Sequence, residues 1–168
     1  AEPQPLHPAV ERRAPDPERP RCLAGVAVGA GQRPHQRRAL GPFEAARAIV
    51  AAEEIGGGAA RGTNLNIPLP EGTDGQAYEK GLEQALARIA DFDPAFLVVA
   101  AGVDTYERDP MGNFTLTTED LGRVGERIGA LGLPTIAVQE GGYYTPHIGR
   151  NVQALLLGLS EGARTKAG

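Results

Sequence analysis

Asp104 is the residue whose type and position most clearly suggest chemistry. It follows FLVVAAG, residues 96–102, a continuous apolar run with β-branched residues in its middle. Such a run is typical of a strand covered on both faces in a parallel α/β sheet. Open sheets of this kind bind ligands beyond the carboxyl ends of their strands. Asp104 is therefore a candidate ligand, although an aspartate here could equally cap a turn, and this segment alone leaves both interpretations open.

A second apolar strand is followed by another side chain able to do chemistry. PTIAVQ, residues 134–139, runs directly into EGGY, which ends at Tyr143. The sequence therefore predicts that two strands deliver a carboxylate and a phenol to one edge of a sheet. Taken alone, the double glycine and tyrosine would indicate an ordinary strand-to-helix turn. Beside Asp104, a functional role for the tyrosine is the better interpretation.

These motifs in combination resemble the zinc-dependent deacetylases, a family that includes histone deacetylases, acetoin-utilisation proteins and acetylpolyamine amidohydrolases. The pattern DT-x-x-x-DP-x-G-x-F-x-LT begins at Asp104, and RGTNLNIPLPEGTDGQAY, residues 61–78, is similar to an upstream glycine-rich loop of the family. The resemblance runs from about Glu53 to Gly162 and concerns the C-terminal half of the family's domain. The segments GTNLN and VQEGGYY are most similar to those of the bacterial acetylpolyamine amidohydrolases.

The resemblance implies a fold and a set of residue roles. The fold would be α/β, a partial parallel sheet flanked by helices, as in the C-terminal part of the arginase/deacetylase fold. The family residue that matches Asp104 is one of three protein ligands to zinc, and the one that matches Tyr143 donates a hydrogen bond to the substrate carbonyl. Gly141 and Gly142 would let substrate or neighbouring chain approach closely. We expect Asp109 to have a structural role, in which it fixes the loop before Pro110.

The implied chemistry is hydrolysis of an acetylated amine, either a small acetylpolyamine or an acetyl-lysine of a protein. Zinc with three protein ligands lowers the pKa of its bound water to about 7 and polarises an amide carbonyl. A phenol aimed at the developing oxyanion stabilises the tetrahedral intermediate.

Part of the implied machinery is missing from this sequence. The family takes its other two zinc ligands from an upstream Asp-x-His motif and its general base from a tandem histidine pair. The three histidines here, His7, His35 and His147, stand in neither setting. One carboxylate cannot hold catalytic zinc, so we expect the chain by itself to be inactive or very weak. We expect His147 to be a solvated or capping residue.

The first 42 residues differ in composition from the rest. They hold eight of the fourteen prolines, and seven arginines against four acidic residues, so they bury little apolar surface. We expect 1–42 to be disordered or outside the family, 43–162 to form the deacetylase-like domain, and 163–168 to be a tail. A truncated family member, a reading-frame change upstream of about residue 43, and an unrelated extension are three open explanations.

Composition argues against several other function classes. The net charge is −4, and no aromatic residue interleaves the N-terminal arginines, so a nucleic-acid partner is not expected. LAGVAVGAG is too short to span a membrane, and the N-terminal stretch lacks the apolar core of a secretory signal. The single cysteine, Cys22, fits a reducing compartment. We therefore expect a cytoplasmic protein.

Helical patterns surround the two strands. We expect helices over 43–54, 75–92 and 148–159, and a capping box of Thr117 and Asp120 predicts one more. Two strands are few for such a fold and would leave sheet edges and apolar faces uncovered. We therefore expect poor solubility or dependence on another polypeptide. The competing hypothesis is a non-catalytic remnant or interaction module of the same fold.

Overall fold

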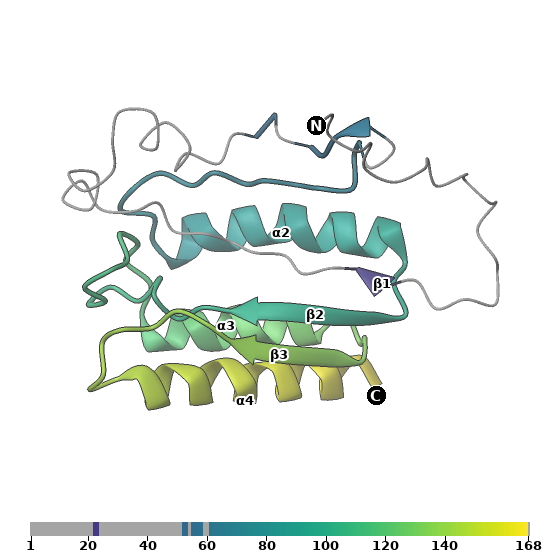
Figure 1. Ribbon diagram of the computed structural model, residues 1–168. Helices are drawn as coiled ribbons and strands as arrows, with labels where there is room; N and C mark the ends of the chain where they lie inside the picture. Colours follow the sequence, from purple (N-terminus) through teal and green to yellow (C-terminus); the bar gives the residue numbers. More distant parts are fainter. Residues whose placement is uncertain (1–21, 24–51, 54, 59–60, 168) are drawn as a thin grey trace, which may run out of the picture.

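The described part of the chain is an α/β unit built on a short parallel sheet (Figure 1). The computed structural model describes residues 22–23, 52–53, 55–58 and 61–167. Its elements are β1 (Cys22–Leu23), α2 (Gly75–Phe92), β2 (Phe96–Ala101), α3 (Thr118–Gly129), β3 (Thr135–Gln139) and α4 (Ile148–Ala167). Most of 1–42, and the helix expected over 43–54 except for a turn at 52–53, lie outside the described residues.

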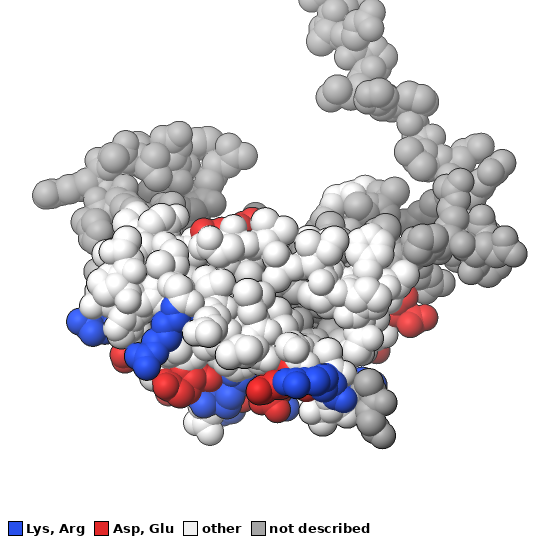
Figure 2. All heavy atoms as spheres, turned by 90° about the horizontal axis from the view of Figure 1, so that it is seen from below, with Lys and Arg blue, Asp and Glu red and all other residues white. Residues whose placement is uncertain are grey.

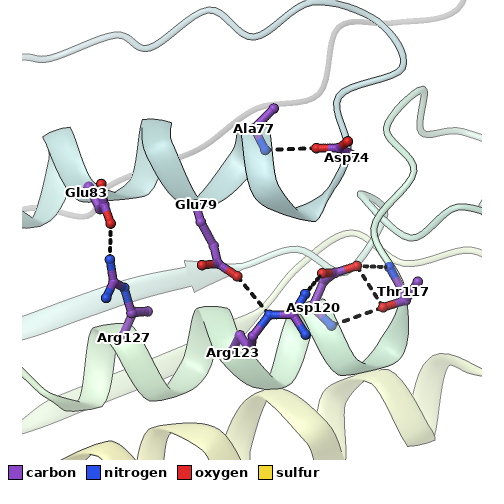
Figure 3. A network of polar contacts seen from close by, with 8 residues as sticks. All are labelled: Asp74, Ala77, Glu79, Glu83, Thr117, Asp120, Arg123 and Arg127. Atoms are coloured by element: carbon purple, nitrogen blue, oxygen red, sulfur yellow. Dashed lines mark hydrogen bonds and ion pairs between the residues drawn. The ribbon is translucent and has the colours of Figure 1, made fainter.

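The helices before and after β2 begin at side-chain caps. The Asp74 carboxylate accepts a hydrogen bond from the Ala77 amide, 2.8 Å away. The predicted capping box at the start of α3 is confirmed, since the Asp120 amide donates to the Thr117 hydroxyl and the Thr117 amide donates to the Asp120 carboxylate (Figure 3). A methyl group on Gly75 would collide with the Asp120 carboxylate. The two helix starts therefore pack directly against each other.

Two ion pairs fix how α2 lies along α3 (Figure 3). Arg123 donates to the Glu79 carboxylate at 2.8 Å, and one turn further on Arg127 pairs with Glu83. The Arg123 side chain is 51% exposed, and exposed pairs of this kind contribute only about 0–1 kcal/mol. Their main effect is on the register of the two helices, while the free energy of packing comes from the apolar residues beneath them.

The sheet places the ends of β2 and β3 side by side. The two strands are parallel and in register from Leu97 with Thr135 to Ala101 with Gln139, and β1 pairs with the other edge of β2. The pairing continues past the strands, because the amide of Glu140 donates to the carbonyl of Ala101 at 3.2 Å. The loops that follow β2 and β3 therefore start at the same edge of the sheet.

Every β2 residue is buried or partly buried, whereas the neighbouring strand β3 is largely exposed. Alternate β2 residues join the core, with Leu97 only 1% exposed and Ala101 8% exposed. The residues that alternate with them lie on the other face, beside β3 residues that are largely exposed. We call this surface the open face: Phe96, Val98, Ala100, Ile136 and Val138. Ile136 and Val138 are 59% and 47% exposed, so no described helix covers them.

A second apolar surface lies on α4. Leu156 and Leu157 are 48% and 55% exposed. Seen from the side of α4, charged side chains gather along one border and the middle of the face carries none (Figure 2). Exposed apolar side chains that lie together can mark a contact surface for another polypeptide, so both surfaces are candidates for such packing.

The contact of α3 with α4 depends on glycine. A methyl group on Gly125 would collide with the Leu155 carbonyl, and one on Gly158 would collide with the Gly122 carbonyl. The two backbones thus approach more closely than any larger residue allows. The same pattern repeats one turn further on at Gly129 and Gly162, and α4 continues to Ala167, beyond the helix end predicted at residue 159.

Gly158→Ala tests this close packing. The added methyl group must push the two helices apart, and we expect the free energy of unfolding to fall by about 1–3 kcal/mol, the usual cost of overpacking. Gly149→Ala is the matched control in the same helix, because nothing lies within 4 Å of its added methyl group. Urea denaturation should show the control unchanged or more stable; equal effects at both positions would contradict the packing account.

Candidate active site

The carboxylate of Asp104 lies between the two strand ends. A methyl group on Gly141 would collide with it, and one on Gly102 would lie 2.8 Å from its Oδ1. The Val103 amide donates to the Gly141 carbonyl at 2.8 Å and holds the two segments together. On its other side the Asp104 backbone packs so closely on Gly112 that no side chain fits there. Three glycines therefore create the space that Asp104 occupies.

The surroundings of Asp104 disfavour its charge. Partial burial raises the pKa of its carboxyl, and the nearby charges of Asp109 and Glu140 raise it further, while a hydrogen bond from its own backbone acts the other way. Burial, with the Asp104 charge as a second cause, also raises the pKa of Tyr78 to about 12. A partly buried carboxylate with other acidic side chains nearby is suited to bind a cation.

Asp109 connects the loop after β2 with the segment after β3. Its Oδ1 accepts hydrogen bonds from the amides of Met111 at 2.9 Å and Gly112 at 3.2 Å. Its Oδ2 accepts from the amides of Tyr143 at 2.6 Å and Tyr144 at 3.1 Å. The expectation that Asp109 fixes its own loop is confirmed, but the side chain does more. It is 2% exposed and holds the backbone of the candidate oxyanion donor.

The segment after β3 needs its two glycines for different reasons. Gly141 leaves room for the Asp104 carboxylate. Gly142 has φ +146°, and a side chain there would also meet Val103, so a larger residue would be strained. Tyr143 follows with its side chain 54% exposed, and no hydrogen bond to its hydroxyl is found within the described residues. The phenol is therefore accessible to a ligand, while its backbone is fixed.

His147 does stand at the start of α4 as a capping residue would, since its carbonyl accepts a hydrogen bond from the Asn151 amide at 2.9 Å, but its side chain is not simply solvated. Its ring is half-buried, and its Nδ1 lies 2.7 Å from the hydroxyl of Tyr106. Tyr144 packs against both rings. Sequence reasoning missed this cluster because Tyr106 and His147 are far apart in the chain. The aromatic residue two positions after Asp104 was the one available signal.

The described residues do not complete a metal centre. None of them form a group of three or more His, Cys, Asp or Glu side chains able to hold a metal ion. Near Asp104, the Asp109 carboxylate is already engaged by four backbone amides, and His147 is engaged by Tyr106. This donor set does not fit catalytic zinc, which takes three protein ligands. His7 and His35 lie outside the described residues.

An apolar pocket lies elsewhere, between α2, β2 and α3. The residues that line it are all aliphatic: Leu82, Ala85, Leu86, Ile89, Leu97, Val98, Val99 and Ile128. Aliphatic residues offer no group that could polarise a carbonyl or transfer a proton, so the candidate site remains the edge with Asp104. Over the described residues, no helix is both long and apolar enough to cross a membrane.

Asp104→Asn should show that the charged Asp104 carboxylate lowers the stability of the folded chain. The pKa of the Asp104 carboxyl is higher in the folded than in the unfolded chain. Its ionisation therefore leaves the free energy of unfolding unchanged below the unfolded-state pKa. The free energy of unfolding then falls as the pH rises through the folded-state pKa. At pH 7 in a chelating buffer, Asn should therefore raise the midpoint of thermal unfolding by a few degrees. Near pH 3, where both states are protonated, the difference should vanish. A variant less stable than the parent at pH 7 would contradict this.

Asp109→Asn should weaken the connection between the two loops. The amide keeps one acceptor oxygen but turns an NH₂ group toward backbone donors, so two hydrogen bonds to a charged acceptor are lost. We expect the free energy of unfolding to fall by about 2–4 kcal/mol. Asp91→Asn, an exposed carboxylate at the end of α2, is the control, with a change within about 0.5 kcal/mol. Urea denaturation of both variants measures the difference, and equal effects would show that Asp109 is not a clamp.

Comparison with known proteins matches this geometry to a family. The profile of the histone deacetylase domain matches residues 49–159. Acetylpolyamine amidohydrolase 1 of Pseudomonas aeruginosa is 44% identical over 113 residues, which are 67% of this chain and 33% of that protein. Histone deacetylase 8 of Xenopus laevis is 33% identical over 98 residues, 58% of this chain and 30% of that protein.

A solved structure agrees. The crystal structure of acetylpolyamine aminohydrolase from Burkholderia pseudomallei superimposes with a TM-score of 0.66 at 36% identity, over 69% of this chain and 34% of that one. The chain spans about a third of the length of the relatives it matches. The fold is that of the arginase/deacetylase proteins, and with two thirds of its residues matched by the domain profile, the chain belongs to the histone deacetylase family.

Proposed function

We propose that this chain contributes part of the active site of a zinc-dependent amidohydrolase that acts on acetylated amines. Asp104 would be one metal ligand, and the Tyr143 hydroxyl would donate to the oxygen of the acetyl group as it becomes negative. The observation that carries the proposal is the shared edge of β2 and β3. There Asp104 packs on Gly141, and Asp109 holds the Tyr143 backbone.

Rigidity at this edge supports the role of the phenol. A hydrogen-bond donor stabilises an oxyanion best when it is already in place and need not reorganise during the reaction. Tyr143 has a backbone fixed by a buried carboxylate and an accessible side chain. An oxyanion donor requires this combination of a fixed backbone and an accessible hydroxyl group.

Similarity supports the substrate class. Relatives at 44% identity are acetylpolyamine amidohydrolases, and relatives near 33% identity are histone deacetylases. Both names describe proteins that act on an acetylated amine, and the higher identity favours a small acetylpolyamine over an acetyl-lysine of a protein.

Zinc would need ligands from outside the described residues. Asp104 supplies one carboxylate, the Asp109 carboxylate beside it is engaged by four backbone amides, and the described residues hold no group of three metal-binding side chains, so no catalytic step through a metal follows from this part of the chain. A further polypeptide segment that packs on the open face, where Ile136 and Val138 are exposed, would be at the same sheet and able to bring such ligands.

The open face also favours a second candidate function. A chain that keeps an exposed apolar sheet surface and has only one metal ligand would serve as a non-catalytic interaction module. The two candidates differ in what depends on Tyr143, because an interaction through the open face does not involve the phenol.

Tyr143→Phe separates the two functions. The chain is purified from its own cells with any polypeptide that stays bound, and zinc content and hydrolysis of an acetylpolyamine are measured. Loss of one oxyanion donor should lower turnover by about a hundredfold or more. Tyr144→Phe is the matched control, since it removes the same hydroxyl one residue later. Absence of zinc and of turnover in the parent preparation would favour the interaction module.

A further inference from the structure

A hydrogen bond between Tyr106 and His147 joins the two site loops at a second point. The Tyr106 hydroxyl lies 2.7 Å from His147 Nδ1. Tyr106 is 4% exposed and belongs to the loop after β2, and His147 is half-buried just before α4. Neither residue has a part in the proposed chemistry, yet a buried phenol hydroxyl and an imidazole are costly to place here unless each satisfies the other.

The same pair holds the ring of Tyr144. The Tyr144 ring packs edge-on against the His147 ring, with centroids 5.3 Å apart, and its centroid lies 6.0 Å from that of Tyr106. The guanidinium of Arg108 lies 4.8 Å from the centre of the Tyr144 ring. Aromatic and cation–π contacts of these kinds each contribute in the range of a hydrogen bond. Tyr144 is therefore held by groups from both loops.

Tyr144 in turn decides where the Tyr143 backbone lies. The Tyr144 carbonyl accepts hydrogen bonds from the amides of His147 at 3.0 Å and Ile148 at 3.1 Å, which starts the turn into α4. Tyr143 itself is 54% exposed, so few contacts of its own ring restrain it. Its direction must then come from the backbone on either side.

We propose that Tyr106 and His147 are positioning residues for Tyr143. Together they form a brace, defined as Tyr106, His147 and the Tyr144 ring between them. The brace holds the segment that begins at Gly142 through the Tyr144 ring, while Asp109 holds it through the backbone amides of Tyr143 and Tyr144. This inference rests on the proposed function only for the task of the Tyr143 phenol.

Amide hydrogen exchange, followed by NMR on the metal-free full chain, tests the brace. Tyr106→Phe removes only the hydroxyl, and His147→Phe keeps an aromatic ring of larger size but removes the ring nitrogens. Each should speed exchange at Tyr143 and Tyr144 by about tenfold, the effect on local opening of losing one ordinary hydrogen bond. The double variant should add little, because both changes remove the same interaction. His147→Asn, which restores an acceptor near the Nδ1 position, should return most of the protection.

Two controls separate positioning from general stability. Exchange at Leu121 in α3 should stay unchanged in every variant, and Tyr144→Phe, which keeps the ring, should leave Tyr143 protected. If His147→Phe does not fold, Tyr106→Phe decides alone. Unchanged exchange at Tyr143 in Tyr106→Phe, or equal acceleration at Leu121, would overturn the proposal. The measurement needs neither metal nor turnover, so a chain without hydrolase activity could still confirm the brace.

Discussion

One buried carboxylate, that of Asp109, holds together the two loops on which the candidate site is built. Its two oxygens accept hydrogen bonds from four backbone amides, and hydrogen bonds to a carboxylate are stronger than those between neutral groups. Two of the amides belong to its own loop and two to the segment after β3. Because β2 and β3 are parallel neighbours, their loops start at the same edge of the sheet. The hydrogen bonds of Asp109 then fix the Tyr143 backbone relative to the loop that carries Asp104.

Glycine has the complementary role of making room. Gly102, Gly112 and Gly141 surround Asp104 so closely that side chains there would displace it. The cost appears in the raised pKa of Asp104, because partial burial disfavours the charged form of its carboxyl. Stability and proposed function therefore oppose each other at Asp104 and support each other at Asp109, as is common where a site is built on a rigid scaffold.

Local patterns in the sequence predicted much of this. The apolar run before Asp104, the helix over 75–92 and the box of Thr117 with Asp120 depend on neighbours within a few residues, so they can be recognised without the fold. Two other contacts join residues more than thirty positions apart in the chain: the hydrogen bond from the Tyr143 amide to Asp109, and the one between Tyr106 and His147. Only tertiary packing creates such contacts. The exposure of β3 could not be predicted, because an apolar strand sequence indicates a preference for burial and not the presence of a covering element.

Scalar coupling across hydrogen bonds tests the central claim most directly. In the ¹⁵N,¹³C-labelled chain, the account predicts measurable coupling from the amide nitrogens of Tyr143 and Tyr144 to the carboxyl carbon of Asp109, alongside those of Met111 and Gly112. Coupling confined to Met111 and Gly112 would show that Asp109 only closes its own loop. In that case nothing fixes the phenol relative to Asp104, and the common site at the ends of β2 and β3 would be contradicted.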